Sequence, residues 1–344
     1  MKCYLGYEQR GSPSVGRNQH ESKPHPLVAV ARVSSPPPGL PESSSGARYI
    51  FTDDEAELRE VLQESEIVFY WGWGIPILKA AWSDSAKVRW IHSAGVGVES
   101  LQFPELLASD VVVTNCRGIY EQPMAEYALM LMLLFAKDVV HTLEDQRAHR
   151  WNRRHADALW GRQLLIVGAG SIGRAIARQA RALGMRTIGV ARSRREADAD
   201  FEAIYPLAEL LDRLPEADYV VLALPLTSAT AGVMGREAFG RMKRTARLLN
   251  LGRGPLVDEA ALLDALTSGR IAGAALDVYW KEPVPEDHPL WDLPNVILSP
   301  HMSGEIPGIQ AAFVEIFLEN LALWQAGQPL KNTVDLALGF VPTP

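Results

Sequence analysis

The chain has 344 residues, which is enough for about two domains of ordinary size. Its 34 Lys and Arg against 41 Asp and Glu give a formal charge of −7, which argues against a nucleic-acid-binding surface, and 47% hydrophobic residues exclude wholesale disorder. Its two cysteines, Cys3 and Cys116, are too few for a disulfide framework or a cysteine-rich zinc site, so we expect no metal and a reducing, cytoplasmic compartment. The longest strongly apolar run is about half the ~20 residues of a membrane-spanning helix, so no membrane partner is expected.

The N-terminal part of the chain is irregular. Residues 1–26 are rich in Gly, Ser, Pro, Asn and His without an apolar period, and we expect a disordered extension there. A strand is predicted over 27–31. The Ser- and Pro-rich segment 33–47 is predicted to be a loop, because its prolines prevent a helix.

Strand and helix patterns alternate from residue 48 onward. The expected strands are 48–52, 67–71, 88–92 and 111–115, with helices at 53–64 and 75–82. Such alternation predicts a parallel, doubly wound sheet. A long helical stretch, 122–147, follows, and its part 125–136 is apolar almost all round. A helix of that kind is expected to be buried between domains or subunits.

The alternation then restarts and predicts a second sheet. The expected strands are 164–167, 187–190, 219–224, 248–250, 273–277 and 296–299, with helices at 171–183, 207–213 and 259–268. This is the strand count of a complete nucleotide-binding domain. A final helix, 313–326, is expected to return to the first unit.

A glycine-rich turn links the first strand of this second unit to a helix. It reads Gly168-Ala169-Gly170-Ser171-Ile172-Gly173. The first glycine permits the tight turn, the second lets a pyrophosphate approach the backbone, and the third lets the helix pack on the strand. Free N–H groups of Ser171 and Ile172 at the helix start would hold the anion. The spacing and its strand–turn–helix context predict a dinucleotide site.

The next strand ends at Ala191, where an NAD-binding domain carries an acidic residue for the adenosine ribose. Arg192, Ser193, Arg194 and Arg195 follow instead. This segment is either a solvated surface loop or a cradle for the 2′-phosphate of NADP. We favour the cradle, with NADP as the preferred cofactor and NAD as a possible one.

Four polar residues come after the carboxyl ends of predicted strands. In open α/β sheets, ligands bind at these ends. Arg253 lies between two glycines after one strand, Asp277 closes the next, Glu282 comes five residues later, and His301 follows the last strand. Each alone could be a surface residue, a turn cap or a loop histidine. Together they indicate a catalytic cluster.

These motifs resemble the signatures of the D-isomer-specific 2-hydroxyacid dehydrogenases. The resemblance covers about residues 48–332 and rests on the segments 168–173, 250–258, 277–283 and 299–304. The arginine-rich loop makes the chain most similar to the NADPH-dependent glyoxylate/hydroxypyruvate reductases. The resemblance implies a Rossmann dinucleotide-binding domain, 121–301, and a flavodoxin-like, discontinuous substrate domain formed by 27–120 and 302–344. It also implies a homodimer, in which the helix 125–136 is covered.

The resemblance further assigns roles to individual residues. It implies a catalytic triad of Arg253, Glu282 and His301, with Arg253 also binding substrate. The substrate carboxylate is expected at the N–H groups of Val96 and Gly97. The residues implied to contact the cofactor beyond the glycine-rich turn and the arginine loop are Leu224, Pro225, Thr230, Leu251, Gly252 and Asp277, the last at the nicotinamide carboxamide.

The chemistry of these side chains agrees with such roles. Hydride transfer to a 2-oxo acid develops negative charge on the carbonyl oxygen, where a protonated His301 can donate its proton while Glu282 stabilises the imidazolium. Arg253 offers a permanently charged, planar fork for the carboxylate and the carbonyl. The expected activity is therefore reduction of a small 2-oxo acid, such as glyoxylate or hydroxypyruvate, to the D-2-hydroxy acid with NAD(P)H.

Two questions stay open at the level of sequence. Trp71, Trp73 and Tyr120 fall near the expected substrate pocket, where they either pack in the core or narrow the pocket. The same fold also occurs in NAD(P)-sensing corepressors that retain the triad, so the triad does not by itself exclude a binding protein. The absence of the long tail and basic elements of those regulators favours the enzyme.

Overall fold

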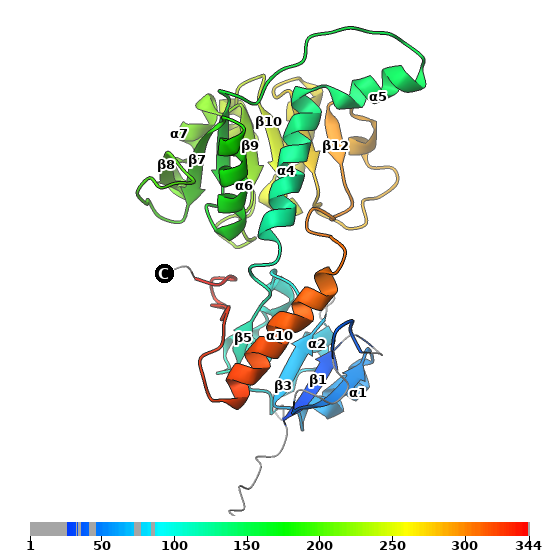
Figure 1. Cartoon of the computed structure of the whole chain (residues 1–344), viewed down its shortest axis with the longest axis vertical. Coiled ribbons are helices and arrows are strands. Elements are labelled where there is room, and N and C mark those ends of the chain that lie inside the picture. The colour runs from blue at the N-terminus through cyan, green and yellow to red at the C-terminus, as the bar shows by residue number, and fades with distance from the viewer. Residues whose placement is uncertain are drawn as a thin grey trace, which may run out of the picture.

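The computed structural model describes residues 26–31, 33, 36–40, 46–71, 77–83 and 87–342. Except for Pro26, the expected N-terminal extension lies outside these residues, as does Trp73. Figure 1 shows two α/β domains, each built on a parallel sheet, connected before α4 (Glu121–Ala136) and before α10 (Ile309–Gln325). The predicted fold class, two doubly wound parallel sheets, is confirmed.

The first sheet has the strand order β2-β1-β3-β4-β5, and all neighbouring strands run parallel. Its strands are β1 (Leu27–Ala31), β2 (Arg48–Thr52), β3 (Ile67–Tyr70), β4 (Trp90–Ser93) and β5 (Val112–Thr114). One face packs against α1 (Glu55–Leu62), α2 (Ile77–Ala81) and the short α3 (Pro104–Leu107). The other face packs against α10, whose Phe317 stacks on Phe69 with ring centroids 4.2 Å apart. The last long helix therefore covers the first sheet.

The second sheet has the order β12-β11-β10-β9-β6-β7-β8 and is also parallel throughout. Its strands are β6 (Gln163–Val167), β7 (Arg186–Ala191), β8 (Ala203–Pro206), β9 (Tyr219–Leu222), β10 (Arg247–Asn250), β11 (Gly273–Leu276) and β12 (Val296–Leu298). Its helices are α6 (Ser171–Ala182), α7 (Leu210–Arg213), α8 (Arg236–Arg241) and α9 (Glu259–Thr267). The order reverses between β6 and β9, the position where ligands bind in doubly wound sheets.

The expected single helical stretch over 122–147 is wrong in one respect, because the structure contains two helices there. α4 ends at Ala136, and α5 (Val139–Arg147) begins after Asp138, whose φ of 52° is left-handed and ends the first helix. One side of α4 is buried against α6 and the second sheet, so this burial lies within the second domain rather than between domains. Met130 and Leu133 on another side are 40% and 36% exposed, so an all-round apolar sequence does not give all-round burial within one chain.

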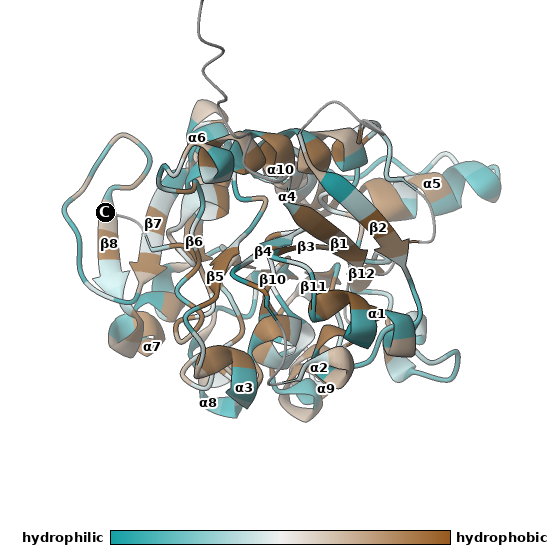
Figure 2. Ribbon diagram, turned by 90° about the horizontal axis from the view of Figure 1, so that it is seen from below, coloured by the Kyte–Doolittle hydropathy of each residue, from teal (hydrophilic) through white to brown (hydrophobic). Residues whose placement is uncertain are grey.

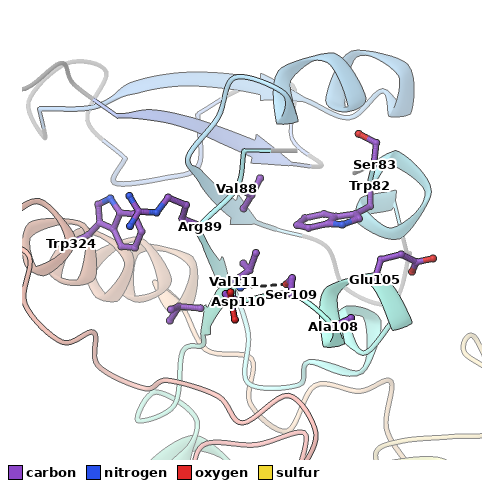
Figure 3. A pocket seen from close by; sticks show the side chains of 11 residues that line it. Trp82, Ser83, Val88, Arg89, Glu105, Ala108, Ser109, Asp110, Val111 and Trp324 are labelled. Carbon is purple, nitrogen blue, oxygen red and sulfur yellow. Dashed lines mark hydrogen bonds between the residues drawn. The ribbon is translucent and has the colours of Figure 1, made fainter. Parts of the chain in front are cut away.

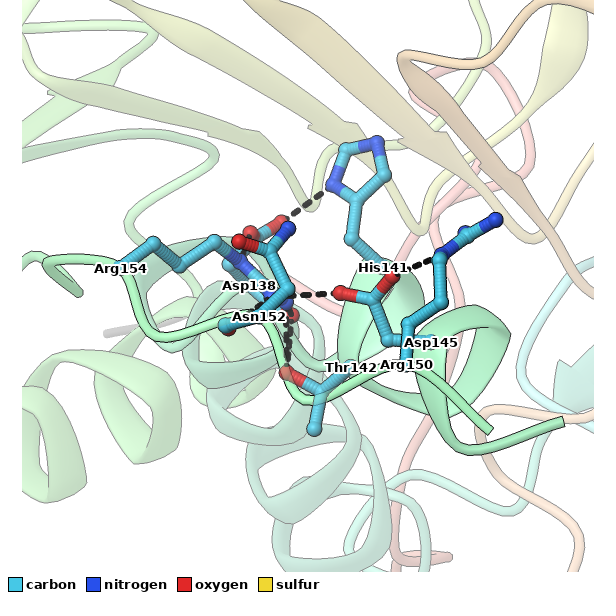
Figure 4. A network of polar contacts seen from close by, with 7 residues as sticks. All are labelled: Asp138, His141, Thr142, Asp145, Arg150, Asn152 and Arg154. Carbon is cyan, nitrogen blue, oxygen red and sulfur yellow. Dashed lines mark hydrogen bonds and ion pairs between the residues drawn. The ribbon is translucent and has the colours of Figure 1, made fainter. Parts of the chain in front are cut away.

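A polar network fixes the turn between α4 and α5 and the loop that follows (Figure 4). Arg154 donates to Asp138, to Thr142 Oγ1 at 2.7 Å and to Asp145 at 2.9 Å. Arg150 donates to the other oxygen of Asp145 at 2.9 Å. The arm formed by α5 and its loop is therefore held in one orientation relative to the end of α4.

The distribution of apolar and polar residues follows the sheet and helix layers of the fold. Figure 2 shows largely apolar strands, with hydrophilic residues gathered on parts of the helices. Among the described helices, none combines the length and the apolar character needed to cross a membrane.

Candidate active site

The glycine-rich turn lies between β6 and α6. Gly168 has a φ of 113°, and a Cβ there would lie 2.4 Å from the Ala223 carbonyl oxygen, so only glycine is accommodated. A Cβ on Gly173 would lie 2.0 Å from the Gly168 carbonyl oxygen, whereas Gly170 faces open space. Because α6 begins at Ser171, the N–H groups of its first turn are not used in the helix. These features suit a nucleotide pyrophosphate.

In the loop after β7, Arg192 and Arg194 make different contacts. Arg194 forms an ion pair with Glu209, at 2.6 and 2.8 Å to the two carboxylate oxygens, and lies over the Tyr205 ring. Arg192 instead lies over the ring of Phe340, with its guanidinium carbon 5.7 Å from the centroid. Ser193 is exposed between them. The charge of Arg194 is thus already balanced by a neighbouring carboxylate.

Two further loops that were expected to line the cofactor site lie next to each other. A Cβ on Gly252 would come within 3.0 Å of the Leu224 carbonyl oxygen, and Leu251 is buried beside it. Thr230 closes the loop that begins at Pro225, because its Oγ1 donates to the Pro225 carbonyl at 2.8 Å. The residues following β9 and β10 therefore lie side by side at the carboxyl edge of the sheet.

His301 and Glu282 form a hydrogen-bonded pair. His301 Nδ1 is 2.8 Å from Glu282 Oε2, and the Tyr279 backbone N–H donates to Glu282 Oε1 at 3.0 Å. The carboxylate is thereby oriented from both sides. With Nδ1 engaged, the imidazole can present Nε2 to a substrate. Such an arrangement suits proton donation.

Asp277 holds the loop that carries His301. Its carboxylate is fully buried and accepts hydrogen bonds from Ser299 Oγ at 2.7 Å and from the N–H groups of Met302 and Ser303 at 2.9 Å each. These donors flank His301 on both sides. The resemblance implied a cofactor contact for Asp277, and its anchoring of this loop was not foreseen. The sequence signal was present, since a carboxylate at the end of a buried strand needs several donors.

Arg253 lies against the first domain. A Cβ on Gly97 would be 2.0 Å from Arg253 Nη2, so the absence of a side chain at Gly97 makes room for the guanidinium. Arg253 Nη1 donates to the Gly252 carbonyl at 2.8 Å, and Nε is 2.9 Å from Glu99 Oε1. The loop containing Val96 is held by Asn115, whose Nδ2 donates to the Val96 carbonyl at 2.8 Å. The expected substrate loop and Arg253 are thus brought together.

Glu99 was missed by the sequence analysis. It lies two residues beyond Gly97, at the start of a single 3₁₀ turn, and is 154 positions from its partner Arg253. The one sequence signal for Glu99 is its position directly after the Val96–Gly97 loop, whose N–H groups are expected to bind an anion.

The aromatic residues near the site pack within the first domain. Trp71 and Tyr120 both contact the Phe313 ring of α10, with centroids 5.8 and 5.9 Å apart. Tyr120 also covers Gly304, where a Cβ would lie 2.3 Å from its ring. Burial raises the pKa of the Tyr120 hydroxyl above its ordinary value. Core packing is therefore the role that these contacts support.

The cavity drawn in Figure 3 is not part of this site. It has a volume of about 630 Å³ and is lined by residues that precede β4 and β5, including Arg89 and Asp110, together with Trp82 and Trp324. These residues lie at the amino ends of the strands, opposite the edge that carries Gly97.

Comparison with known proteins identifies the family. Residues 129–303 match the family described as D-isomer specific 2-hydroxyacid dehydrogenase, NAD binding domain. The glyoxylate reductase of Korarchaeum cryptofilum is 36% identical over 271 residues, which make up 76% of this chain and 80% of that protein. The glyoxylate/hydroxypyruvate reductase B of Serratia proteamaculans is 32% identical over 290 residues, 82% of this chain and 88% of that protein.

Solved structures give the same result. The NADPH-dependent glyoxylate/hydroxypyruvate reductase of Sinorhizobium meliloti, in complex with NADP and sulfate, is 26% identical and superimposes with a TM-score of 0.77, covering 92% of this chain and 100% of that chain. A D-isomer specific 2-hydroxyacid dehydrogenase of Xanthobacter autotrophicus, in complex with NADPH and MES, is 28% identical with the same TM-score and coverage. The chain belongs to the D-isomer-specific 2-hydroxyacid dehydrogenases, a family of NAD(P)-dependent oxidoreductases.

Proposed function

We propose that the protein reduces a small 2-oxo acid, with glyoxylate and hydroxypyruvate as the leading candidates, to the corresponding D-2-hydroxy acid, and that it prefers NADPH. One observation carries the proposal. The His301–Glu282 pair and Arg253, which rests on the Gly97 loop, follow neighbouring strands of one sheet, β12, β11 and β10. The similar glyoxylate and glyoxylate/hydroxypyruvate reductases favour a reductase over the alternative of a nucleotide-sensing corepressor.

Substrate binding in this proposal uses backbone donors and one cation. The N–H groups of Val96 and Gly97 bind the carboxylate, since a loop with two glycines lets an anion approach the backbone. The guanidinium of Arg253 presents planar donors that bridge the carboxylate and the carbonyl oxygen. Glu99, which is 2.9 Å from Arg253 Nε, then shares the guanidinium with the substrate.

Proton transfer in this proposal uses His301. Its protonated imidazole donates from Nε2 to the carbonyl oxygen, while Glu282 at 2.8 Å balances the charge on Nδ1. Arg253 stabilises the developing negative charge on the same oxygen. NADPH, when bound, supplies the hydride. The buried carboxylate of Asp277 keeps the His301 loop in place during the reaction.

The proposed cofactor site extends along the carboxyl edge of the second sheet. The turn of Gly168, Gly170 and Gly173 and the N–H groups of Ser171 and Ile172 hold the pyrophosphate. The remaining contacts are assigned to Leu224, Pro225, Thr230, Leu251, Gly252 and Asp277. Arg192, Ser193 and Arg194 bind the 2′-phosphate, with Arg194 shared with Glu209. The absence of an acidic residue at Ala191 supports NADPH, and NADH is a weaker alternative.

We also propose the domain division stated above and a cytoplasmic homodimer. Apolar side chains on the outer face of α4 and α5 are uncovered, namely Met130, Leu133, Val140 and Leu143, and Trp151 in the following loop is 98% exposed. Exposed apolar side chains on neighbouring helices favour an interaction site. The occupant in this proposal is a second copy, because α5 projects from the domain (Figure 1) and a two-fold interface uses the same surface on both subunits. Light scattering tests this proposal, and a species of 37.8 kDa at micromolar concentration would contradict it.

The enzymatic proposal is tested by following NADPH oxidation with a panel of 2-oxo acids that includes glyoxylate, hydroxypyruvate and pyruvate. We expect turnover with the smallest members. Activity confined to formate or phosphite would overturn the substrate assignment.

A further inference from the structure

The C-terminal segment crosses from the first domain toward the nucleotide-binding domain. Its beginning is anchored on the first sheet, where the Val334 N–H donates to the Val113 carbonyl at 2.8 Å and the Val334 side chain is buried in the core. Gln102 Nε2 then donates to the Leu336 carbonyl at 2.7 Å. In Figure 1 the segment, coloured red, rises from the end of α10 to the level between the two domains.

Residues 335–340 form a closed turn, which we name the C-terminal turn. The Asp335 N–H donates to the Phe340 carbonyl at 3.1 Å, and the Gly339 N–H donates to the Asp335 carbonyl at 2.8 Å. Immediately beyond the turn, Arg117 Nη1 donates to the Val341 carbonyl at 3.3 Å. Hydrogen bonds to the first domain thus hold the chain on both sides of Phe340.

The half-buried ring of Phe340 meets Arg192 of the second domain, whose guanidinium carbon is 5.7 Å from the ring centroid. A cation over an aromatic face is attracted by the ring quadrupole. None of the described side-chain hydrogen bonds or ion pairs uses the Arg192 guanidinium, so its N–H groups are available for an anion. The neighbouring Arg194 differs, because its Nη2 already pairs with both carboxylate oxygens of Glu209.

We propose that Phe340 is a positioning residue of the nucleotide site, which holds the Arg192 guanidinium at the carboxyl end of β7 for the 2′-phosphate of the adenosine ribose. The inference rests on the proposed preference for NADPH. It adds that the first domain supplies part of the phosphate site through the C-terminal turn. Restricting the Arg192 side chain in advance lowers the entropy lost when it binds the phosphate.

The test is isothermal titration of the full-length protein with adenosine 2′,5′-bisphosphate and with adenosine 5′-monophosphate, which differ in the 2′-phosphate alone. We expect Phe340→Leu to weaken binding of the bisphosphate about threefold to tenfold, the range of a cation–π contact, and to change binding of the monophosphate less than about twofold. Phe340→Tyr keeps the aromatic face and is expected to bind as the parent does. Leu338→Ala, a truncation in the same turn, is the matched control for disturbance of the turn itself.

A double-variant cycle separates positioning from simple packing. In the Arg192→Ala background, Phe340→Leu is expected to have no further effect on binding of the bisphosphate. Additive losses, equal losses for both nucleotides, or a Phe340→Leu variant that binds like the parent would each overturn the inference. A parent protein that binds the two nucleotides equally would instead overturn the proposed NADPH preference. If the parent discriminates and Arg192→Ala abolishes that discrimination, the preference stands whatever the result for Phe340.

Discussion

Replacement of Glu99 by glutamine tests how the two domains share the substrate site. Glu99 Oε1 lies 2.9 Å from Arg253 Nε, and both side chains are about one-third exposed, at 36% and 33%. The proposed substrate is an anion that binds the same guanidinium. Glu99 therefore competes with it and repels it. Glutamine has nearly the same shape, so Glu99→Gln removes the negative charge and keeps one acceptor for Arg253.

The size of the effect follows from Coulomb's law. Two carboxylates on one guanidinium are about 6 Å apart, and with the screening of a partly exposed site their repulsion is roughly 1 kcal/mol. This corresponds to a KM for the 2-oxo acid that is about fivefold lower in the variant. We expect kcat to change less than about threefold, because Arg253 keeps its hydrogen bond to the Gly252 carbonyl.

The assay is steady-state NADPH oxidation with glyoxylate or hydroxypyruvate as the varied substrate. Glu105→Gln is the matched control, because this exposed carboxylate of α3 lines the remote cavity and makes no described contact with Arg253. A higher KM in Glu99→Gln, or a kcat reduced more than about twentyfold, would refute the competition and make Glu99 an essential support for Arg253.

Three further predictions follow from other parts of the structure. His301→Asn and Arg253→Ala are each expected to lower kcat at least about a hundredfold in steady-state assays, because both residues act on the carbonyl oxygen. NADPH binding, followed by fluorescence titration, is expected to stay near that of the parent. Near-normal turnover would contradict their roles. The double variant Ala191→Asp/Arg192→Ala is expected to raise kcat/KM with NADH relative to kcat/KM with NADPH, since the new carboxylate accepts hydrogen bonds from the ribose and repels a 2′-phosphate. An unchanged ratio of the two kcat/KM values would contradict the assignment of this loop. Burial lowers the pKa of His92 from 6.5 to about 3, so below pH 6.5 the unfolded chain gains a proton that the folded chain does not, and the free energy of unfolding should fall by about 2 kcal/mol between pH 6.5 and pH 5. Urea titrations should show that His92→Gln loses this part of the pH dependence, and an equal slope in parent and variant would speak against a neutral buried histidine.

Much of the fold could be predicted from the sequence, because buried parallel strands and the helices between them leave strong periodic signals. Both sheets and α6, expected over 171–183 and observed over Ser171–Ala182, were predicted in this way. The elements that were missed, β8, α3 and α8, are four to six residues long, which is too short for a period to be resolved. The break at Asp138 was missed because a single left-handed residue leaves no periodic signal.

The residues of the candidate site also differ in how well the sequence predicts them. Residues that share a short motif, such as Gly168 or His301, could be singled out because the motif itself carries the chemistry. Glu99 and Phe340 could not, since each acts through an arginine far away in sequence and only the folded chain shows which arginine that is. Asp277 was found but its loop-anchoring contacts were not, because the sequence indicates that a buried carboxylate needs donors without showing which backbone N–H groups supply them.

The central claim, that these residues reduce a 2-oxo acid to the D-2-hydroxy acid with NADPH, is tested most directly with hydroxypyruvate, whose product is chiral. The measurement is the rate of NADPH oxidation together with chiral chromatography of the glycerate formed, for the parent and for His301→Asn. We expect D-glycerate in a one-to-one ratio with the NADPH consumed, and loss of both signals in the variant. Formation of L-glycerate, or no turnover of hydroxypyruvate, glyoxylate or any other 2-oxo acid by the parent, would contradict it.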